Sequence, residues 1–498
     1  MEKYKEFGQV FTPKWIVKEI LDLVEFTENN LLNKKIIDPA CGDGAFLIEV
    51  VSRTLDTLIK NNFSNNEIIR YLEEHIYGIE IDRIEFEKCI QNLNSIVNTK
   101  LNKSQKINWK ILCDDTLDKY KDFIGIFDFV IGNPPYIRIH NLDKETREKL
   151  KYEFEFCNGT IDIYIAFFEL GFKLLNNKGV LGYITPNSYL HNTSYSNFRE
   201  YLKGKKALET LVDFKANKLF KGFSTYTAIT IISFSTSRTN FIYKELKDGK
   251  IKEINQISYL ELNKKDWSFS GKDDMLFLDN IYSNNGAKVS DYFDVQYGFA
   301  TLRDKIFIGN ITDENKSLVL FNESWIEKKI LYKIVKGSTY KGTDNEIKYV
   351  IFPYEKYGER FIPIPENKLK LEYPNTHKYL LKNKDELLKR DIDKGASWYE
   401  FGRSQGVQTS FNEKIVLSTL VNHKIHFYKL NKDIFVYSGI FIIKKNPDVN
   451  WKIITDILDS SDFYKYIQIT GKDFSGGYKS VTSNQIKNYP INKKILTL

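Results

Sequence analysis

Short apolar segments alternate with amphipathic helical patterns over the first 235 residues, and this order constrains the fold most strongly. Residues 45–60 show helical spacing of apolar side chains, and strand patterns occur at residues 34–38, 76–82, 108–115 and 127–132. Strands joined by helices at this spacing form a doubly wound sheet. The sequence therefore predicts an α/β fold with a mostly parallel, Rossmann-like sheet.

Local signals predict where individual helices begin and end. Thr12 and Pro13 stand where an N-cap and a first helical residue would precede the apolar pattern "WIVKEILDLV". A later helical pattern, "IYIAFFELGFKLLNNKG", is expected to continue until Gly179. The strand "VLGYITP" is expected to follow it.

Changes in composition and in the secondary-structure pattern divide the chain into three parts. Residues 1–245 carry the alternating pattern and are expected to form the catalytic domain. Residues 246–285 are polar, rich in Lys and Asn, and are interpreted as a connecting segment. Residues 286–498 contain short strands, aromatic residues and turns, which predicts a second domain of mixed α+β structure.

Unusual residues follow four successive strands of the predicted sheet. The segments are "DPACGDG", "IEID", "CDD" and "NPPY". Ligands of parallel sheets bind beyond the carboxyl ends of the strands. A carboxylate after the second strand can accept from two ribose hydroxyls, and one after the third can accept from an adenine amino group. Together they describe an adenosine pocket, for which S-adenosylmethionine is the commonest phosphate-free ligand.

The glycine turn differs from the dinucleotide fingerprint G-x-G-x-x-G. Phe46 and Leu47 follow where a third glycine would be due, and Glu80 lies 38 positions after Gly42 (80 − 42). The fingerprint places its acidic residue about 20 positions on. A pyrophosphate ligand is therefore not expected.

The segment "NPPY", Asn133 to Tyr136, has the groups needed to bind a planar amino group. The Asn133 side-chain carbonyl and the Pro134 backbone carbonyl can accept its two N–H bonds, and proline fixes φ and removes a competing donor. Two such acceptors free the nitrogen lone pair for attack on a methyl group. Tyr136 can stack on the ring, which contributes about 1–3 kcal/mol per base.

These motifs, in this order, resemble those of the gamma-class, TaqI-like DNA adenine-N6 methyltransferases. "GQVFTP" is similar to their N-terminal cofactor motif, "DPACGDGAFL", "GIEID" and "CDDTL" to the next three, and "NPPYIR" to the methyl-transfer motif. The resemblance covers residues 8 to 235 strongly and the C-terminal part more loosely. It implies S-adenosylmethionine as the cofactor, S-adenosylhomocysteine as the product, and a target-recognition domain at the C-terminus.

The resemblance also implies roles for individual residues. Asn133, Pro134, Pro135 and Tyr136 would act in methyl transfer. Phe220 is the first choice for the aromatic that sandwiches the target base, with Phe223 and Tyr226 as alternatives because this segment is about one residue longer than the family pattern. The cofactor-binding residues would be Thr12, Pro13, Asp38, Ala40, Gly42, Gly44, Glu80, Ile81, Asp115 or its neighbour Asp114, Asn133 and Phe167.

Double-stranded DNA is the expected second substrate. The formal net charge of +8 favours an anionic partner. An adenine amino group is paired inside the duplex, so the base would have to be flipped out at a cost of a few kcal/mol. The turns "QYGFATLRDKIF", "SWYEFGRSQG" and "FSGGYKSVTSNQIKNYPI" resemble recognition segments, and their candidate contacts are Arg303, Lys305, Arg403 and Lys479.

Three other functions fit some of the same residues. A protein glutamine-N5 methyltransferase also uses "NPPY" on a planar amide, although such enzymes would not need a basic second domain of about 200 residues. An RNA base methyltransferase is a further alternative. A catalytically inactive DNA-binding protein is disfavoured, because every strand-end residue remains compatible with the pocket.

The remaining sequence features set the expected context of the enzyme. The four cysteines show neither metal-ligand nor disulfide-framework spacing, so no metal is expected. No signal peptide or long apolar run is present, and a prokaryotic cytoplasmic monomer without membrane contact is expected. Because the cofactor motif begins at residue 8, no N-terminal nuclease domain is expected, and a separately encoded restriction endonuclease acting on the same site is a conceivable partner.

Overall fold

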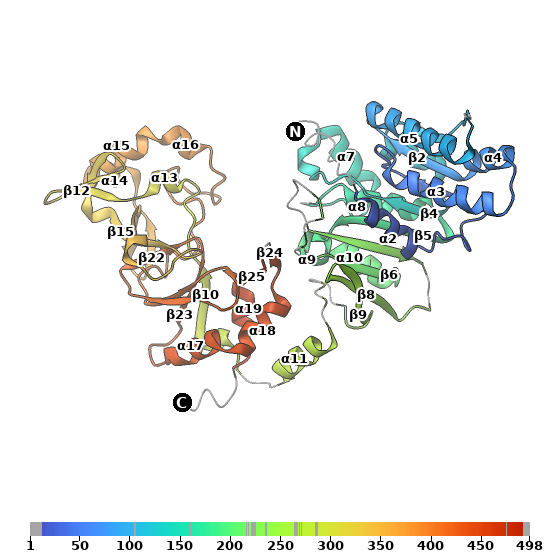
Figure 1. Cartoon of the computed structure of the whole chain (residues 1–498). Coiled ribbons are helices and arrows are strands. Elements are labelled where there is room, and N and C mark those ends of the chain that lie inside the picture. The colour runs from blue at the N-terminus through green and yellow to red at the C-terminus, as the bar shows by residue number, and fades with distance from the viewer. Residues whose placement is uncertain are drawn as a thin grey trace. The chain divides into compact units, whose positions relative to one another are not determined.

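The computed structural model describes residues 12–103, 106–159, 161–215, 217, 219–220, 226–234, 237–262, 267, 269, 271–283, 287–474 and 476–491. The chain divides into two units, Met1–Lys272 and Asp273–Leu498, which are considered separately below. Figure 1 labels the elements of both units.

A nine-stranded sheet forms the first unit, in the order β3-β2-β1-β4-β5-β7-β6-β8-β9. β7 is antiparallel to both of its neighbours and β9 is antiparallel to β8, whereas the other pairs of neighbours are parallel. The predicted doubly wound, mostly parallel sheet is therefore confirmed. Its strands are β1 (Ile36–Asp38), β2 (Ile76–Glu80), β3 (Lys110–Cys113), β4 (Phe127–Gly132), β5 (Leu175–Pro186), β6 (Leu208–Asp213), β7 (Thr227–Ser233), β8 (Asn240–Lys247) and β9 (Lys250–Ser258).

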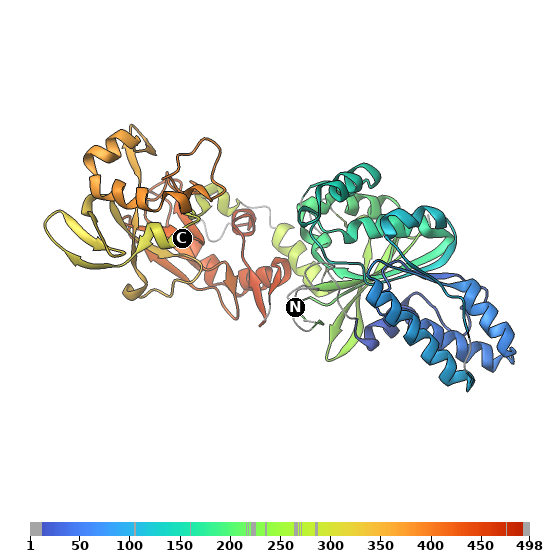
Figure 2. The same ribbon diagram turned by 90° about the horizontal axis from the view of Figure 1, so that it is seen from above.

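Helices cover both faces of this sheet. In Figure 2, α2, α3 and α5 (blue) lie on one face, and α8 and α10 lie on the other. The α2–α5 face is packed with aliphatic side chains, whereas the other carries Phe168, Phe172 and Phe198 in mutual ring contact. The bounds are α2 (Lys14–Leu23), α3 (Ala45–Lys60), α4 (Asn65–His75), α5 (Arg83–Leu101), α6 (Thr116–Lys119), η1 (Tyr120–Phe123), η2 (Ile139–Asn141), α7 (Lys144–Glu153), α8 (Tyr164–Leu174), α9 (Ser188–His191), η3 (Thr193–Tyr195) and α10 (Ser196–Gly204).

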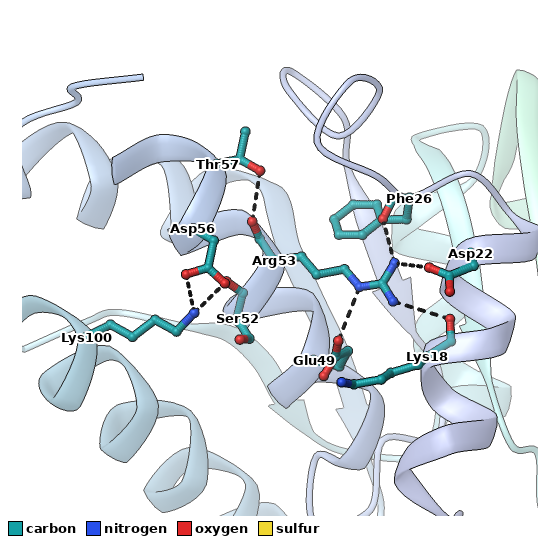
Figure 3. A network of polar contacts seen from close by, with 9 residues as sticks. All are labelled: Lys18, Asp22, Phe26, Glu49, Ser52, Arg53, Asp56, Thr57 and Lys100. Atoms are coloured by element: carbon teal, nitrogen blue, oxygen red, sulfur yellow. Dashed lines mark hydrogen bonds and ion pairs between the residues drawn. The ribbon is translucent and has the colours of Figure 1, made fainter. Parts of the chain in front are cut away.

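Polar contacts tie the helices of the α2–α5 face to one another (Figure 3). The Arg53 guanidinium on α3 donates to Asp22 Oδ1 in the last turn of α2 at 2.6 Å, and to the Phe26 carbonyl just beyond this helix at 3.1 Å. Lys100 on α5 pairs with Asp56 on α3. Arg53 has limited exposure and satisfies carbonyl groups at a helix end, which stabilises this arrangement of helices.

The first unit extends further along the chain than the sequence predicted. The expected boundary at residue 245 is wrong, and so is the first part of the connecting segment expected at 246–285. Both fail because β9 pairs antiparallel with β8 along its length. Asp248 and Gly249, at φ 53° and 73°, form the turn of this hairpin. An Asp-Gly pair with two positive φ angles is typical of a two-residue hairpin turn.

Two expected helix ends also differ from the structure. Pro13 rather than Thr12 occupies the N-cap position of α2, and no side chain caps this end. The helix expected to continue to Gly179 ends at Leu174, and β5 begins at Leu175. A Cβ on Gly179 would lie 2.8 Å from the Phe127 carbonyl of the paired strand β4. The glycine therefore permits close strand packing instead of ending a helix.

The second unit is built from small sheets and short helices, which confirms the predicted mixed α+β structure. Its sheets have the orders β10-β23-β19-β21, β11-β16-β15-β22, β12-β13-β14, β17-β18 and β20-β25-β24. The strands are β10 (Phe293–Tyr297), β11 (Ile308–Gly309), β12 (Ile311–Glu314), β13 (Leu318–Phe321), β14 (Ser324–Glu327), β15 (Leu331–Lys336), β16 (Lys348–Ile351), β17 (Tyr354–Tyr357), β18 (Arg360–Pro363), β19 (Lys414–Leu417), β20 (Leu420–Val421), β21 (Phe427–Leu430), β22 (Ile434–Tyr437), β23 (Ile440–Lys444), β24 (Asp473–Phe474) and β25 (Tyr478–Ser480).

The helices of this part of the chain pack around those sheets. They are α11 (Lys272–Ser283), α12 (Val289–Tyr292), α13 (Asp304–Phe307), η4 (Lys328–Ile330), η5 (Asp344–Glu346), α14 (Glu366–Glu372), α15 (Pro374–Lys382), α16 (Lys384–Leu388), α17 (Trp451–Asp459), α18 (Ser461–Thr470) and α19 (Ser483–Asn488). Within the described ranges, no helix has the length and apolar character needed to cross a membrane.

Candidate functional site

A cavity of about 330 Å³ lies where β1, β2 and β4 end, with the turn after β3 contributing to its wall. Its volume is within the range of small-molecule sites, and this edge of a parallel sheet is where ligands bind. The lining residues are Thr12, Asp38, Pro39, Ala40, Cys41, Gly42, Asp43, Ala45, Phe46, Ile79, Glu80, Ile81, Glu85, Asp115, Thr116, Leu117, Asn133, Pro135, Ile137, Leu142, Asp143, Thr146, Ile163 and Phe167.

Most of the cofactor residues predicted from the sequence lie in this wall. The nine that do are Thr12, Asp38, Ala40, Gly42, Glu80, Ile81, Asp115, Asn133 and Phe167. Pro13, Gly44 and Asp114 are not among the lining residues. The structure thus brings together side chains from six separate segments, and their binding roles stay predictions.

The turn between β1 and α3 is shaped by Gly44. This residue has φ +90° and occupies the N-cap position of α3. A Cβ at this position would lie 2.8 Å from Cys89 Sγ on α5. Only glycine combines this backbone conformation with such close helix packing. Gly44 therefore lets the turn approach the cavity without lining it.

Glu80 closes the cavity at the end of β2. Its Oε2 accepts from the Gly42 amide and its Oε1 from the Asp82 amide, each at 2.8 Å. Burial, the largest influence, raises the pKa of Glu80, and these two hydrogen bonds oppose that effect. A carboxylate has about four acceptor positions, so two stay available to a ligand such as a ribose diol.

The two adjacent acids after β3, Asp114 and Asp115, lie in different surroundings. Asp115 lines the cavity and accepts from the Leu117 amide at 2.9 Å as the N-cap of α6. Burial is the main cause of the raised pKa of Asp115. Asp114 is more exposed and lies 3.7 Å from Lys119 Nζ. The geometry favours Asp115 over Asp114 as the residue that would meet an adenine amino group.

Asp38 lies beneath the cavity at the end of β1 and is 1% exposed. Its Oδ1 accepts from the Ala40 amide at 3.0 Å. Burial raises the pKa of Asp38 to about 8, and the nearby charge of Glu80 adds to this effect. A Cβ on Gly132, which immediately precedes Asn133, would lie 2.5 Å from Asp38 Oδ1. Asp38 therefore packs directly against the start of the "NPPY" segment.

The raised pKa of Asp38 predicts a pH-dependent stability. The folded protein holds this proton up to about pH 8, whereas the unfolded chain releases it near the ordinary value of 3.8. The stabilisation that the protonated Asp38 contributes is complete below pH 3.8. It declines above that pH and is lost once the pH has risen through about 8. Between these limits the free energy of unfolding should fall by about 1.4 kcal/mol per pH unit relative to Asp38→Asn.

Urea unfolding of both proteins in the apo form, at pH 5.5 and pH 7.5, measures this difference. Asp38→Asn is a suitable reference because an amide oxygen can still accept from Ala40 while carrying no titrating proton. Parallel pH dependence of the two proteins would contradict the assignment.

Asn133 is held in one orientation at the cavity wall. Its Nδ2 donates to Thr12 Oγ1 at 3.1 Å. The Thr12 hydroxyl, which was expected to cap α2, therefore contacts the first side chain of the "NPPY" segment. Because the amide nitrogen faces Thr12, Oδ1 is the end of this side chain that can accept from a substrate amino group.

The other residues of "NPPY" differ in their contact with the cavity. Pro135 lines the cavity, Pro134 is buried, and Tyr136 is half-buried. The Tyr136 hydroxyl donates to the Ile184 carbonyl of β5 at 3.3 Å. This bond anchors the outer end of the ring, so the ring is held beside the segment that would contact a substrate.

Phe220 lies against Tyr136. The ring centroids are 6.5 Å apart with an interplanar angle of 71°. Phe223, an alternative for the base-stacking role, lies outside the described residues. Tyr226 immediately precedes β7, and its carbonyl accepts from the Asn187 amide at 2.9 Å. Among the candidates that the structure describes, Phe220 is thus the one with a ring contact to Tyr136.

Five acidic or threonine side chains in the lining were not predicted from the sequence: Asp43, Glu85, Thr116, Asp143 and Thr146. Asp43 and Glu85 come from the glycine turn and α5, and Asp143 and Thr146 from the start of α7. Glu85 Oε1 pairs with Lys88 at 2.8 Å, whereas Oε2 is buried without a hydrogen-bond partner in the described structure. The spacing of Asp143 and Thr146 is that of a helix cap and could have located this helix, but no pattern indicates that it borders the cavity.

The four basic residues proposed for DNA contact lie in the second unit. Arg403 Nη2 lies 2.9 Å from Asp391, and Lys479 Nζ 2.8 Å from Asp473. Arg303 lies 3.6 Å from Glu386, and Lys305 is exposed on α13. Exposed ion pairs contribute at most about 1 kcal/mol, so phosphates could replace the carboxylates of Arg303 and Arg403. Lys479 is only 15% exposed, which makes it the least accessible of the four.

Among the described residues, no group of three His, Cys, Asp or Glu side chains is arranged to hold a metal ion. The polar groups of the cavity are instead mostly carboxylates. Burial raises the pKa values of Asp38, Asp43, Glu80 and Asp115, because it disfavours their charged forms. A ligand that carries positive charge and hydroxyl or amino donors would suit this wall.

Comparisons with known proteins relate this chain to restriction-modification enzymes. The chain is 26% identical to the Type II restriction enzyme and methyltransferase RM.Eco57I of Escherichia coli, over 96% of this chain and 56% of that protein. It is 30% identical to the Type II methyltransferase M.BstVI of Geobacillus stearothermophilus, over 50% of this chain and 46% of that one. The Type II methyltransferase M.BanIII of Aneurinibacillus aneurinilyticus matches 98% of this chain, with 90% of its own length covered, at 25% identity. The chain thus spans about half the length of the first two relatives.

Solved structures share the fold at low sequence identity. The Type IIL restriction-modification enzyme MmeI, solved in complex with DNA, has a TM-score of 0.63 at 14% identity and covers 95% of this chain and 65% of its own. A nuclease-deletion mutant of the Type ISP enzyme LlaGI, bound to a DNA substrate mimic, has a TM-score of 0.57 at 13% identity over 97% of this chain and 53% of its own. These matches concern the fold alone.

The family model named "Eco57I restriction-modification methylase" matches residues 22–220. This segment holds the sheet from β1 to β6 and the cavity residues from Asp38 to Phe167. The Type II methyltransferase relatives agree with the resemblance to gamma-class enzymes that the sequence motifs indicated. Over residues 22–220, the chain is therefore similar to the Eco57I-type restriction-modification methylases.

Proposed function

We propose that this protein is a site-specific DNA methyltransferase that transfers a methyl group from S-adenosylmethionine to N6 of a flipped-out adenine in duplex DNA. The observation that carries the proposal is the position of Asn133. Asn133 lines a cavity suited to an adenosine cofactor, and it also belongs to a motif suited to a planar amino group. The cofactor and substrate sites are therefore contiguous.

The cavity fits the cofactor in charge and in hydrogen-bond acceptors. Asp38, Asp43, Glu80, Glu85 and Asp115 present carboxylates, and Phe46, Leu117 and Phe167 present apolar surface. A positively charged ligand would stabilise the ionised carboxylates, and hydroxyl donors would use the remaining acceptor positions of Glu80. When bound, S-adenosylmethionine supplies an electrophilic methyl group on a positively charged sulfur.

Residues of the "NPPY" segment would hold the amino group of the target base. Asn133 Oδ1 is oriented by the Thr12 contact, and the Pro134 carbonyl is fixed by the proline ring. Accepting both N–H bonds at these oxygens weakens conjugation of the nitrogen lone pair with the ring. Positioning and preorganised acceptors then provide the catalysis, and no side chain must take a proton before transfer.

Tyr136 and Phe220 would bind the faces of the base. Their rings are close but perpendicular, so a flat base between them requires one ring to rotate. The ring centroids are 6.5 Å apart. Rotation of one ring, with the movement needed to admit the base, would create the sandwich.

Double-stranded DNA is the proposed substrate, and residues 273–498 are the proposed recognition region. The net charge of +8 suits a polyanion. MmeI and the LlaGI mutant were both solved with DNA or a DNA mimic. We propose a monomeric enzyme of a restriction-modification system or a solitary methylase, with Arg303, Lys305, Arg403 and Lys479 as candidate DNA contacts.

Incubation with methyl-labelled S-adenosylmethionine tests the substrate class. Duplex DNA from a host that lacks adenine methylation, total RNA and cell protein are offered in parallel reactions. Label should enter DNA and not RNA or protein. Label only in RNA would indicate an RNA base methyltransferase, and label only in protein would indicate a glutamine methyltransferase. Either result would overturn the proposed function.

A further inference from the structure

Asn187 joins both ends of the connection that carries Phe220. This connection leads from β6, which ends at Asp213, to β7, which begins at Thr227. Asn187 follows β5 at the same edge of the sheet. Its Nδ2 donates to Asp213 Oδ1 at 3.0 Å, and its backbone amide donates to the Tyr226 carbonyl at 2.9 Å. The residue directly after β5 thus binds Asp213 and Tyr226, which flank this connection.

Asp213 is the buried acceptor in this set of hydrogen bonds. It is 2% exposed, and its Oδ1 also accepts from the Lys215 amide at 2.9 Å. Lys215 Nζ lies 3.4 Å from Asp213 Oδ2. Burial alone would raise the pKa of Asp213, but the charge of Lys215 and the hydrogen bonds from Lys215 and Asn187 outweigh it and lower the pKa. The buried carboxylate thus holds the chain around it through both of its oxygens.

The first described residue after Asp213 is anchored as well. The Phe214 amide donates to the Thr227 carbonyl at 3.1 Å, which closes the base of the connection between the two strands. Phe214 also contacts Trp15 of α2 edge to face, with centroids 6.1 Å apart. The geometry at the base therefore determines from which point the chain departs toward Phe220.

We propose that Asn187 and Asp213 are positioning residues for the target base, because they set the connection that holds Phe220 against Tyr136. This inference rests on the proposed function. Neither residue lines the cavity described above. Loss of the Asn187–Asp213 hydrogen bond should misplace Phe220 by a small distance without changing the cofactor site. A misplacement of about 1 Å in a positioning group can lower a rate about 100-fold.

Three substitutions separate this role from a general loss of structure. Asn187→Ala removes the side-chain contact, Asp213→Leu removes every acceptor, and Asp213→Asn keeps Oδ1 for Asn187 and Lys215. Glu209→Gln is the matched control, because Glu209 is the second residue of the same strand β6 and makes polar contacts with Ser233 and Arg238 at the opposite end of that strand. The measurements are kcat and KM on duplex DNA, cofactor affinity, and hydrogen exchange of the peptide covering residues 214–226.

We expect kcat to fall about 10-fold in Asn187→Ala and about 100-fold in Asp213→Leu, with Asp213→Asn within about threefold of wild type. Cofactor affinity should stay within about twofold in all of them, and exchange in the peptide 214–226 should increase in Asn187→Ala but not in Glu209→Gln. Unchanged kcat and exchange in Asn187→Ala, or equal losses in Glu209→Gln, would overturn the proposal. If the wild-type protein methylates no DNA, the proposed function fails, and the exchange measurement alone still decides whether Asn187 holds this connection.

Discussion

Replacing Asn133 by Ala should lower kcat for methyl transfer by about 1000-fold or more while DNA binding survives. The substitution removes the acceptor Oδ1 of Asn133. This oxygen is oriented by the hydrogen bond that Nδ2 of the same side chain donates to Thr12 Oγ1 at 3.1 Å. Loss of one preorganised hydrogen-bonding group in an active site costs about 100- to 1000-fold in kcat, and loss of substrate positioning adds to this. Single-turnover transfer of labelled methyl to duplex DNA measures the effect, and gel shift measures DNA binding.

Asn158→Ala is the control for this experiment, because Asn158 is exposed and does not line the cavity. It should retain wild-type activity. Asn133→Asp should be less damaging than Asn133→Ala, because a carboxylate oxygen can still accept from an amino group. An Asn133→Ala protein within about 10-fold of wild type would show that catalysis does not depend on this acceptor.

Replacing Glu80 by Gln should weaken S-adenosylmethionine binding by about 100-fold. Glu80 accepts from the Gly42 and Asp82 amides at 2.8 Å, and a glutamine has one acceptor oxygen where the carboxylate has two. One amide would face an NH₂ group, and a ligand hydroxyl would lose a charged acceptor. Hydrogen bonds to charged groups contribute about 1.5–3 kcal/mol, and about 2.7 kcal/mol corresponds to 100-fold in affinity.

Isothermal titration with S-adenosylmethionine measures this loss. Glu87→Gln on α5 is the matched control, since Glu87 is 55% exposed and its contact is an ion pair with Arg83. That variant should bind like wild type. Equal affinity of Glu80→Gln and Glu87→Gln would remove Glu80 from the binding site.

The sequence predicted the sheet well where strand patterns end in distinctive turns. The ends of β1, β2 and β4 lie at Asp38, Glu80 and Gly132, directly before or within the motifs. Prediction was poorer where local patterns are ambiguous. Leu175 continues a helical pattern yet pairs with Phe127 of β4, because tertiary strand pairing outweighs local helix preference there. The β8–β9 hairpin was missed although Asp248-Gly249 is a strong turn signal.

The candidate site could be predicted only as far as its motifs. Asp38, Glu80 and Asn133 follow strands in a recognisable order, so their meeting at one edge follows from the topology. Glu85 lies on a helix and Asp143 beyond a loop, and nothing in their local sequence reveals that they face the cavity. The contact of Thr12 with Asn133 joins residues 121 positions apart, and local capping rules assigned Thr12 a different partner.

The central claim is tested most directly by the chemical identity of the methylated base. Duplex DNA is incubated with the protein and methyl-labelled S-adenosylmethionine, digested to nucleosides and analysed by mass spectrometry, with Asn133→Ala in parallel. The account predicts labelled N6-methyladenine with wild-type protein and none with Asn133→Ala. Label in a cytosine nucleoside, or transfer that is equal in the two proteins, would contradict it.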